Sequence, residues 1–539
     1  MVKQQLLEDL KWAVEDLGFS GDDIVISSPQ NPSFGDYTAN IALQLAKQKL
    51  KNCKQTPMEI ANEIVSDLRT LSYLSDIEIK EPGFINFFIK PEFLTKDLEE
   101  ILEKGKDFGR SESGKGKKAS VEFVSANPTG PMHFGNARGG PIGDTLASVL
   151  EFCGYEVMRD YYHNDIGSQV DKLGESIVNV AQGQKLEDQE YKGEYVKELA
   201  KEIKTDDPKQ ASKQALEILL KENLDVAKEM GIKFDRVSYE SEFLGSSQTK
   251  KALMVLEEKD VLKKQEGAVW FAPGDEFLKD RESVVIKSDG NYTYFTNDIA
   301  YHNLKFSQGT DLVVDILGAN HHGHVPRLKA AVSVLGFDVS NFHVVLYQWV
   351  RFKRGGEIVK MSKRAGTFIT VREILEEIGK DPLKFFILMY DANSPIDFDL
   401  ELAKQQSNKN PVFYVQYAFA RMANILRKVK SEKCNPSTVL GARVQSCGIL
   451  NKKEELELIK HLSYFPDLIE EVARNYQVQH LTTYAITLAD LFHKFYENCR
   501  VLNAENEELK TARLSLVLAS KLVLANVLGI MGIDAPERM

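Results

Sequence analysis

Residues 121–140 read VEFVSANPTGPMHFGNARGG, and the expected fold class follows from this segment. It opens with VEFVS, a mostly apolar run of the kind that forms a buried strand of a parallel sheet. A glycine-rich turn follows, then a helix pattern from about Ala137 to Cys153, with Gly154 at the C-cap position that favours glycine. YEVMRDYYH at 155–163 has the pattern of a second strand. Strand, turn, helix and strand form a βαβ unit, so we expect an α/β fold whose sheet binds a nucleotide.

Further strand patterns follow along the chain. Residues 168–265 are charged and mostly helical, which we interpret as an insertion on the sheet. A helix expected at about 325–336 lies between two strands and supplies a second βαβ half. From residue 371 onward we expect helices and no strand of note. The strands expected between these regions are AVWFA at 268–272, SVVIKS at 283–288, YTYFT at 292–296, DLVVDILG at 311–318 and FHVVLYQWVRF at 342–352.

The N-terminal part reads as a compact α+β module. Its helix patterns cover 3–18, 36–51 and 57–72, and its strand patterns cover 77–81 and 83–89. It ends at SESGKGKKAS, residues 111–120, a composition typical of an exposed linker. We therefore expect three parts, at 1–112, 113–400 and 401–539.

Composition excludes several classes of protein. The chain has 539 residues, 43% hydrophobic and 27% charged, as in a globular protein. Its five cysteines are scattered singly with no CxxC pair, which fits a reducing compartment, so we expect a cytoplasmic protein. Lys521 interrupts 515–532, the longest apolar stretch, so we expect no span of about 18–20 residues and no membrane partner.

The charge is unevenly distributed. The net charge is −11, yet residues 401–539 hold 18 basic and 15 acidic residues, hence +3, and the rest of the chain carries −14. An acidic surface rejects polyanions in general. Any contact with nucleic acid must therefore come from local basic patches.

Two segments have the composition of phosphate-binding loops. In PTGPMHFGNARGG, 128–140, Gly130 and Gly135 let a backbone approach a ligand, and His133 and Asn136 supply donors before a helix N-terminus. In KRGGEIVKMSKRAG, 353–366, basic residues surround flexible glycines, and such a loop closes over a polyphosphate. Taken alone, each has a simpler explanation: a tight turn with a hydrogen-bonded histidine, and a solvated basic hairpin.

Together the two segments resemble a known pair. HxGN after the first strand and KMSKR after the last are similar to the double signature of class I aminoacyl-tRNA synthetases. Longer stretches across nearly the whole chain resemble the arginyl-tRNA synthetase family. They are FGDYTANIALQLAK (34–47), EPGFINFFI (81–89), YYHNDIG (161–167), KSDGNYTYFTNDIAYH (287–302), GANHHGHVPRLK (318–329), VKMSKRAGTFITVREIL (359–375), NPVFYVQYAFARM (410–422) and MGIDAPERM (531–539).

The resemblance implies a Rossmann-like class I catalytic domain between an α+β N-terminal module and an all-α C-terminal anticodon-binding domain. It implies a ligase that makes arginyl-adenylate from ATP with release of pyrophosphate, then transfers the arginyl group to tRNA-Arg. The implied partners are arginine, tRNA-Arg and ATP with Mg²⁺ as a substrate complex, with no tightly bound cofactor and a monomeric enzyme. GANHHGH contains three histidines, but no zinc-ligand spacing surrounds them, so we expect no metal site.

The resemblance also implies roles for particular residues. Asn136 departs from the family, whose motif has a second histidine there, although asparagine keeps a neutral N–H donor. The implied catalytic residues are His133, Asn136, Lys360 and Lys363. The implied ATP-binding residues are Pro128, Gly130, His133, Gly135, Asn136, His324, Met361 and Lys363. The implied arginine-binding residues are Glu122, Ser125, Asn127, Tyr294, Asp298 and His321.

Among these residues we expect Asp298 to bind the guanidinium, with Tyr294 beside it. A guanidinium is a planar fork of donors that a carboxylate fits, whereas the ammonium of lysine is a point charge. Without the resemblance, an N-cap of a helix at 299–306 would explain Asp298 as well. Lysine should be rejected because buried acceptors stay unpaired, at about 1–3 kcal/mol each.

The resemblance implies tRNA contacts at both ends of the chain. The C-terminal candidates are Tyr414, Gln416, Tyr417 and Arg421, since aromatic rings stack on splayed bases and arginine meets phosphates. Most aromatic residues at helical spacing are nevertheless core residues. The N-terminal candidates are Asp36, Tyr37 and Asn86.

Two alternative functions differ from an active ligase. A catalytically inactive tRNA-binding paralogue would have lost KMSK, Glu122 or Asp298, and all are present. A small-molecule nucleotidyltransferase shares the turn and the sheet, but does not need a helical tail of about 140 residues.

Overall fold

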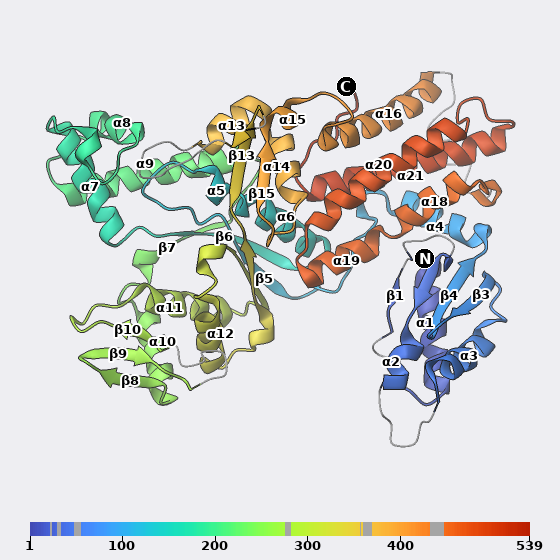
Figure 1. The fold of residues 1–539 in the computed structure, drawn as a ribbon, viewed down its shortest axis with the longest axis horizontal. Helices are drawn as coiled ribbons and strands as arrows, with labels where there is room; N and C mark the ends of the chain where they lie inside the picture. Colours follow the sequence, from blue (N-terminus) through green and yellow to red (C-terminus); the bar gives the residue numbers. More distant parts are fainter. Residues whose placement is uncertain are drawn as a thin grey trace.

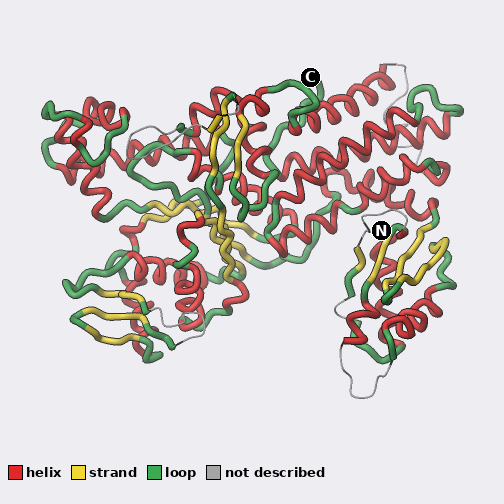
Figure 2. The backbone as a smooth tube through the Cα atoms, in the orientation of Figure 1, coloured by secondary structure: helices red, strands yellow, loops and turns green. Residues whose placement is uncertain are grey.

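The computed structural model describes residues 1–21, 24–27, 29, 34–47, 55–274, 282–355, 357–358, 369–431 and 447–539. A parallel sheet lies at the centre of the molecule (Figure 1). The C-terminal helices lie on one side of it, and the N-terminal module hangs below them. On the other side are a helical lobe with α7 to α9 and a mixed lobe with α10 and β8 to β10, as the helices and strands of Figure 2 show.

The central sheet confirms the expected α/β fold. Its strand order is β12-β11-β5-β6-β7, with every neighbouring pair parallel. The strands are β5 (Lys118–Glu122), β6 (Glu156–His163), β7 (Arg236–Tyr239), β11 (Leu312–Gly318) and β12 (Phe342–Tyr347). The turn after β5 leads into α5 (Phe134–Ala137) and α6 (Gly139–Phe152), and α12 (Val325–Val334) precedes β12. The strand expected at 121–125 thus ends three residues early, so Val124 and Ser125 belong to the turn.

The region 168–265 is less purely helical than expected. Helices α7 (Ser168–Ala181), α8 (Glu194–Glu202) and α9 (Pro208–Glu229) pack around a small core of their own. The chain then returns to the central sheet as its edge strand β7, whose four residues the sequence interpretation missed. α10 (Ser247–Glu258) follows, and β8 (Leu262–Gln265), β9 (Ala268–Phe271) and β10 (Ser283–Ile286) form an antiparallel sheet.

The strand expected at 292–296 is wrong, because α11 (Tyr294–Ser307) begins there. The Thr293 hydroxyl donates to the backbone carbonyl of Val284 at 2.8 Å, which ties the start of the helix to β10. Asp298 therefore lies inside α11 and is not its N-cap.

The apolar run 342–352 forms two strands rather than one. β12 ends at Tyr347, and the chain passes through Gln348 and Trp349 into β13 (Val350–Arg354), which belongs to another sheet. β13 pairs with β14 (Glu357–Ile358) and with β15 (Ile396–Asp399), a short strand in the part expected to be helical. Helices α13 (Val371–Ile378), α14 (Lys380–Leu388) and α15 (Leu400–Lys404) surround them.

The N-terminal module has an antiparallel sheet of order β1-β2-β4-β3. Its elements are α1 (Val2–Asp16), β1 (Ile26–Ser27), β2 (Tyr37–Ala39), α2 (Ile41–Lys47), α3 (Pro57–Leu68), β3 (Leu74–Lys80), β4 (Phe84–Ile89) and α4 (Pro91–Lys104). The expected helix at 36–51 is thus partly wrong. Asp36 forms an ion pair with Lys460, and Tyr37 and Asn86 are buried. Asp36 therefore links the module to the C-terminal helices, while Tyr37 and Asn86 pack inside the module, and a tRNA contact at these three residues stays a prediction.

The C-terminal part is helical as expected. It consists of α16 (Pro411–Ser431), α18 (Lys453–Ser463), α19 (Phe465–Asn475), α20 (Gln479–Asn498) and α21 (Glu507–Ile530). The expectation that no segment has the length and composition of a membrane span is wrong for α21, which passes that test. However, 67% of the apolar window in α21 is buried among the other helices, as in a core helix.

Candidate active site at the carboxyl edge of the parallel sheet

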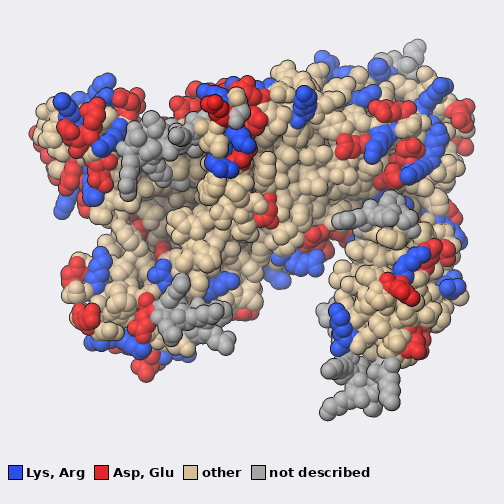
Figure 3. All heavy atoms as spheres, viewed as in Figure 1, with Lys and Arg blue, Asp and Glu red and all other residues tan. Residues whose placement is uncertain are grey.

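A cavity of about 760 Å³ opens at the carboxyl ends of β5, β6 and β11. This edge is where α/β sheets bind their ligands. Figure 3 shows the molecule hollowed between the lobe with α7 to α9 and the lobe with β8 to β10. The structure brings eight of the sequence-predicted residues together around the cavity: Glu122, Ser125, Asn127, Pro128, Tyr294, Asp298, His321 and His324.

The turn after β5 shapes one wall of the cavity. Val124 and Ser125 have φ of 68° and 35°, an unusual conformation for residues other than glycine, and the Ser125 N–H donates to the Phe123 carbonyl at 3.0 Å. The turn aims the Ser125 hydroxyl at two groups. It donates to Glu122 Oε1 at 3.2 Å and accepts the Tyr162 N–H at 3.1 Å. The strained backbone thus links the ends of β5 and β6.

Asn127 continues this wall. Its Oδ1 accepts the backbone N–H and the hydroxyl of Thr129, at 3.1 and 2.6 Å, which closes a local turn. Its Nδ2 donates to Gln169 Oε1 of α7 at 3.1 Å. Pro128, between Asn127 and Thr129 in the sequence, also lines the cavity. The amide of Asn127 is therefore held in one orientation by both the turn and the helical lobe.

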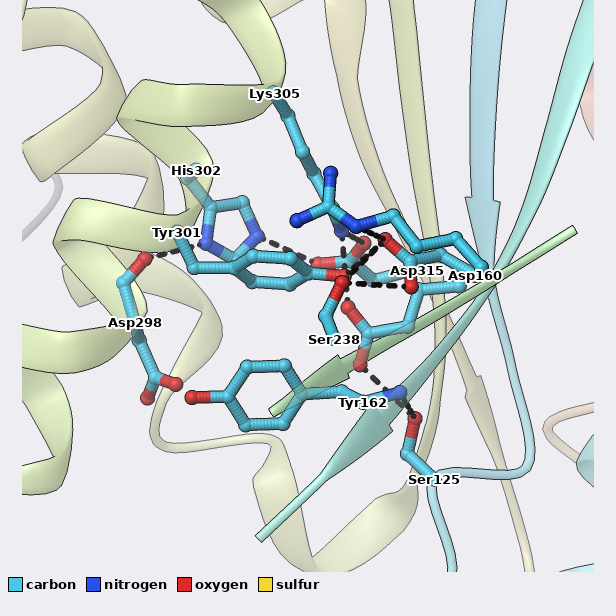
Figure 4. Close-up of polar contacts among 11 residues, drawn as sticks. Ser125, Asp160, Tyr162, Ser238, Asp298, Tyr301, His302, Lys305 and Asp315 are labelled. Atoms are coloured by element: carbon cyan, nitrogen blue, oxygen red, sulfur yellow. Dashed lines mark hydrogen bonds and ion pairs between the residues drawn. The ribbon is translucent and has the colours of Figure 1, made fainter. Parts of the chain in front are cut away.

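A buried ionic network lies behind the wall (Figure 4). Lys305 Nζ of α11 lies 2.9 Å from Glu122 Oε2 and 3.1 Å from Asp315 Oδ1, and His302 Nε2 lies 2.8 Å from Asp315 Oδ2. Burial raises the pKa of Glu122. Burial opposes the ionised form of Asp315 too, but the neighbouring Lys305 and His302 lower its pKa to about 2. Asp315 in turn outweighs burial at His302 and raises the pKa of that imidazole.

Asp160 of β6 extends the network toward β7. Its carboxylate accepts the Ser238 hydroxyl at 2.9 and 3.0 Å and the Tyr301 hydroxyl at 2.9 Å (Figure 4). Sequence reasoning named Glu122 but missed its network partners Lys305, Asp315, His302 and Asp160. A signal was present: His302 and Lys305 follow Asp298 by four and seven residues, so the three share one helix face.

Asp298 presents its carboxylate from α11 to the cavity. His324 Nε2 lies 2.9 Å from Asp298 Oδ2, and the Asp298 carbonyl lies 2.7 Å from the Nδ1 of His302. Tyr294 precedes Asp298 by one helical turn, and 54% of its surface is exposed. The Tyr294 hydroxyl reaches Gly167, where an added Cβ would meet it at 1.9 Å. The cavity thus has one histidine-bound carboxylate beside an exposed phenol.

The HxGN turn lies further along the same segment. His133 forms an antiparallel bridge with Thr370, and the Val371 N–H donates to the Met132 carbonyl at 3.0 Å. This places the turn directly against the residues that follow the basic loop. Asn136 lies in α5, but its side chain is outside the described part of the structure.

The other residues implied to bind ATP lie in different places. Lys360, Met361 and Lys363 fall outside the described residues. Gly130 lies in the turn and Gly135 in α5, and neither is among the residues that line the cavity. The described residues contain no group of histidine, cysteine and acidic side chains arranged to hold a metal ion.

Behind the turn, Arg138 is fully buried. Its guanidinium donates to the backbone carbonyls of Gln348 at 2.7 Å, Ser394 at 2.7 Å and Asp391 at 2.8 Å. Burial lowers its pKa to about 10. Asp391 also accepts the Gln479 amide of α20 at 3.1 Å, so this arginine joins the turn to β13, β15 and the C-terminal helices.

The C-terminal candidates lie on two faces of α16. Tyr414 donates to Asp490 of α20 at 2.7 Å, and the Arg421 guanidinium lies 4.2 Å from the centre of the Tyr496 ring. Tyr417 is 41% exposed and stacks on His493 of α20, with 6.0 Å between the ring centres. Gln416 points elsewhere, donating to Asp381 at 2.8 Å and to the carbonyl of Asp534 at 2.9 Å.

Comparison with known proteins identifies the family. Three family models match the chain: the arginyl-tRNA synthetase N-terminal domain over residues 2–89, the class I (R) tRNA synthetase catalytic domain over 97–387, and the DALR anticodon-binding domain over 415–539. The chain belongs to the arginyl-tRNA synthetase family. A relative named arginine–tRNA ligase from Caldanaerobacter subterraneus is 42% identical to this family member over 96% of the chain and 94% of the relative, and one from Oceanobacillus iheyensis is 38% identical over the same shares.

Solved structures of arginyl-tRNA synthetases share this fold. A putative arginyl-tRNA synthetase from Campylobacter jejuni superposes with a TM-score of 0.75 at 30% identity, covering 84% of this chain and all of the other. The Thermus thermophilus enzyme superposes with a TM-score of 0.81 at 21% identity over the full length of both chains. The expected fold class is thereby confirmed: a class I catalytic domain carries a helical C-terminal domain.

Proposed function

We propose that this member of the arginyl-tRNA synthetase family attaches L-arginine to tRNA in two steps, and that the cavity at the carboxyl edge of the parallel sheet binds the arginine. In the first step a carboxylate oxygen of arginine attacks the α-phosphorus of ATP, and the bond to the pyrophosphate oxygen breaks. In the second, the terminal 2′-hydroxyl of the tRNA attacks the arginyl carbonyl, loses its proton, and AMP leaves. Such a reaction depends on positioning and electrostatics rather than on a covalent enzyme intermediate.

The observation that carries the proposal is the Asp298 carboxylate, which lines the cavity and is held at 2.9 Å by His324. A fixed carboxylate can accept two parallel hydrogen bonds from a planar guanidinium, whereas an ammonium binds it only as a point charge. Tyr294, one helical turn away, closes over the same side chain of the substrate. Ser125 and Asn127 on the opposite wall take the α-amino end, and His321 lines the space between.

Glu122 has a supporting role in this assignment. Its two oxygens are engaged by Lys305 and Ser125, at 2.9 and 3.2 Å. We therefore propose that it holds the turn residue Ser125 in place while its charge is balanced by Lys305. The other carboxylates behind the wall, Asp160 and Asp315, are likewise paired within the network. Asp298 is left as the carboxylate that meets the substrate cation.

ATP, carried as its Mg²⁺ complex, is proposed to lie along the turn after β5. Pro128, Gly130 and Gly135 allow close approach of the phosphates, His133 and Asn136 donate to them, and His324 borders the adenosine. The bridge between His133 and Thr370 supports this assignment, because Thr370 follows Lys360, Met361 and Lys363 closely in the sequence. The lysines would neutralise the charge that develops on the leaving pyrophosphate.

The tRNA is proposed to meet the face shared by α16 and α20. Tyr414, Tyr417 and Arg421 lie there with His493 and Tyr496, a set of rings and one guanidinium suited to stacking on unpaired bases. Gln416 stays a tRNA candidate by sequence only, because its amide is taken up within the chain. We further propose a cytoplasmic monomer with domain boundaries near residues 112 and 400.

The test is arginine-dependent exchange of pyrophosphate into ATP, measured with and without tRNA-Arg and with lysine as the control substrate. We expect strong exchange with arginine and far weaker exchange with lysine. Asp298→Asn should lower kcat/KM for arginine by about a hundredfold or more, since it removes the charge that pairs with the guanidinium. Asp338→Asn changes an exposed aspartate that is not among the residues lining the cavity, so it is the matched control and should leave the rate unchanged. Absence of exchange with tRNA binding retained would instead identify an inactive paralogue.

A further inference from the structure

Tyr162 occupies an unusual position at the end of β6. Its side chain is buried, with 6% of the residue exposed, yet it lines the active-site cavity. Its ring is fixed by contacts with Tyr301 at 4.7 Å and Phe243 at 6.4 Å between ring centres. Its backbone N–H is held by Ser125. Both ends of the residue are therefore anchored, and its hydroxyl has one direction in which to point.

That hydroxyl has no hydrogen-bond partner among the described residues of the chain. Figure 4 shows it pointing toward the carboxylate of Asp298 without reaching a bond. The neighbouring Tyr301 differs, because its hydroxyl donates to Asp160 at 2.9 Å. Leaving a buried hydroxyl unpaired lowers the stability of a folded protein, and proteins rarely retain such a group without a use for it. A phenylalanine would fill the same space at no such cost.

We propose that Tyr162 is a specificity-determining residue for arginine, whose hydroxyl donates to Asp298 and accepts an N–H of the bound guanidinium. The inference rests on the proposed role of the cavity. A guanidinium carries five N–H donors and no acceptor, so it needs more acceptors than one carboxylate provides, and His324 already occupies Asp298 Oδ2. A hydroxyl can donate once and accept at the same time.

Charge supports this assignment. Burial and the nearby Asp298 and Glu240 raise the pKa of Tyr162, so the phenol keeps its proton and has it available for Asp298. The arrangement also disfavours lysine. An ammonium is a compact group that can turn its donors toward Asp298 alone, which leaves the Tyr162 hydroxyl buried and unpaired.

The test compares Tyr162→Phe with the native protein in two measurements. In pyrophosphate exchange, the KM for arginine should rise about tenfold to a hundredfold, the usual effect of losing one hydrogen bond to a charged group. The ratio of kcat/KM for arginine over lysine should fall. In thermal unfolding, the free variant should have an unchanged or higher Tm, whereas the increase in Tm on adding arginine should shrink. Tyr301→Phe is the matched control and should lower the Tm of the free protein, because it takes a donor from buried Asp160.

The outcomes separate this inference from the proposed function. If Tyr162→Phe leaves the KM for arginine unchanged while Asp298→Asn raises it, the role of Tyr162 is wrong and the cavity assignment stands. If neither variant changes the KM, the cavity itself is wrongly assigned. A Tyr162→Phe variant with a lower Tm and a native KM would show a packing role and would also overturn the inference.

Discussion

The catalytic sheet and the C-terminal helices bury polar groups in opposite ways. Behind the cavity, the carboxylates of Glu122, Asp160 and Asp315 lie in one network with Lys305 and His302. The C-terminal interior consists mainly of leucine, valine and alanine. Among its described residues, one ion pair has both partners buried: Arg513 lies 2.7 Å from Glu455. One region gathers charged side chains behind the cavity, and the other has a mostly apolar interior.

Two histidines, buried His302 and half-buried His461, express this difference. His302 lies against Asp315, whose charge outweighs burial and raises the pKa of the imidazole. His461 stacks on Tyr484 at 4.1 Å and lies 3.1 Å from its carbonyl, and burial lowers its pKa to about 4. The same side chain therefore binds a proton more readily in one region and less readily in the other. What decides its state is whether a carboxylate shares its pocket.

The largest expected effect comes from breaking the network. Lys305→Met removes the cation shared by Glu122 and Asp315 and should lower the free energy of unfolding by about 3–5 kcal/mol, because a buried charge is left unpaired. Arginine activation should be lost as well. Adding Glu122→Gln should restore part of the stability, since Asp315 still has His302. Thermal unfolding and pyrophosphate exchange measure both effects, and a stable, active Lys305→Met variant would contradict the idea of a compensated network.

The matched variant in the other region is Arg513→Met. It leaves Glu455 unpaired in an apolar interior and should cost stability on the same scale as Lys305→Met. Exchange of pyrophosphate by the folded variant should nevertheless stay native, because Arg513 contacts the Arg500 carbonyl and Glu455 rather than the cavity. Loss of exchange in the folded variant would mean that the two regions are not independent.

A smaller, pH-dependent effect is expected at His461. Its folded pKa of about 4 lies below that of the unfolded chain, so its contribution to stability is present above pH 6.5 and is lost as the pH falls toward 4. The full loss is about 3 kcal/mol. His461→Gln cannot bind this proton, so chemical unfolding of the two proteins should give stabilities that converge between pH 6.5 and pH 4. His302 has the opposite sign: its contribution is present below pH 6.5 and is lost as the pH rises through its raised pKa. Stabilities of His461→Gln and the native protein that run parallel in pH would refute a neutral His461.

The smallest effect concerns the wall of the cavity. Ser125→Ala removes the hydroxyl that joins Glu122 to the Tyr162 N–H and should cost about 1–3 kcal/mol, with a modest rise in the KM for arginine. The control is Ser176→Ala, a buried serine that donates only to the Lys172 carbonyl within α7. It should change stability less and the KM not at all. Equal effects of the two variants on KM would remove Ser125 from the site.

The strands that sequence reasoning found were rich in apolar and aromatic residues. The expected strand at 311–318 matches β11, because a buried parallel strand is nearly continuous in apolar residues. The expected strand at 155–163 matches β6, although Arg159 and Asp160 interrupt its apolar residues. β7 escaped notice because an edge strand of four residues leaves too short a pattern. The run 342–352 stays apolar across Gln348 and Trp349, so nothing local showed that the chain changes sheet there.

The site was predictable where a motif carries it and not where distant residues meet. Eight residues implied by the family resemblance line one cavity. Lys305 was missed because its partner Glu122 lies 183 residues away, and helical periodicity alone marks it as an ordinary charged residue. Tyr162 was missed for a similar reason. Only the packing of Tyr301 and Phe243 around its ring shows that its hydroxyl is buried.

Arg138 has a consequence for how this protein can change over time. All three of its bonds go to backbone carbonyls, which every amino acid possesses. Substitutions at Gln348, Asp391 or Ser394 therefore leave the acceptors intact, while any replacement of Arg138 strands three of them at once. Mutation is therefore tolerated less well at Arg138 than at the residues that supply its acceptors. For this junction between three segments of the chain, the sequence constraint falls on Arg138, and the side chains of Gln348 and Ser394 are not needed to accept its hydrogen bonds.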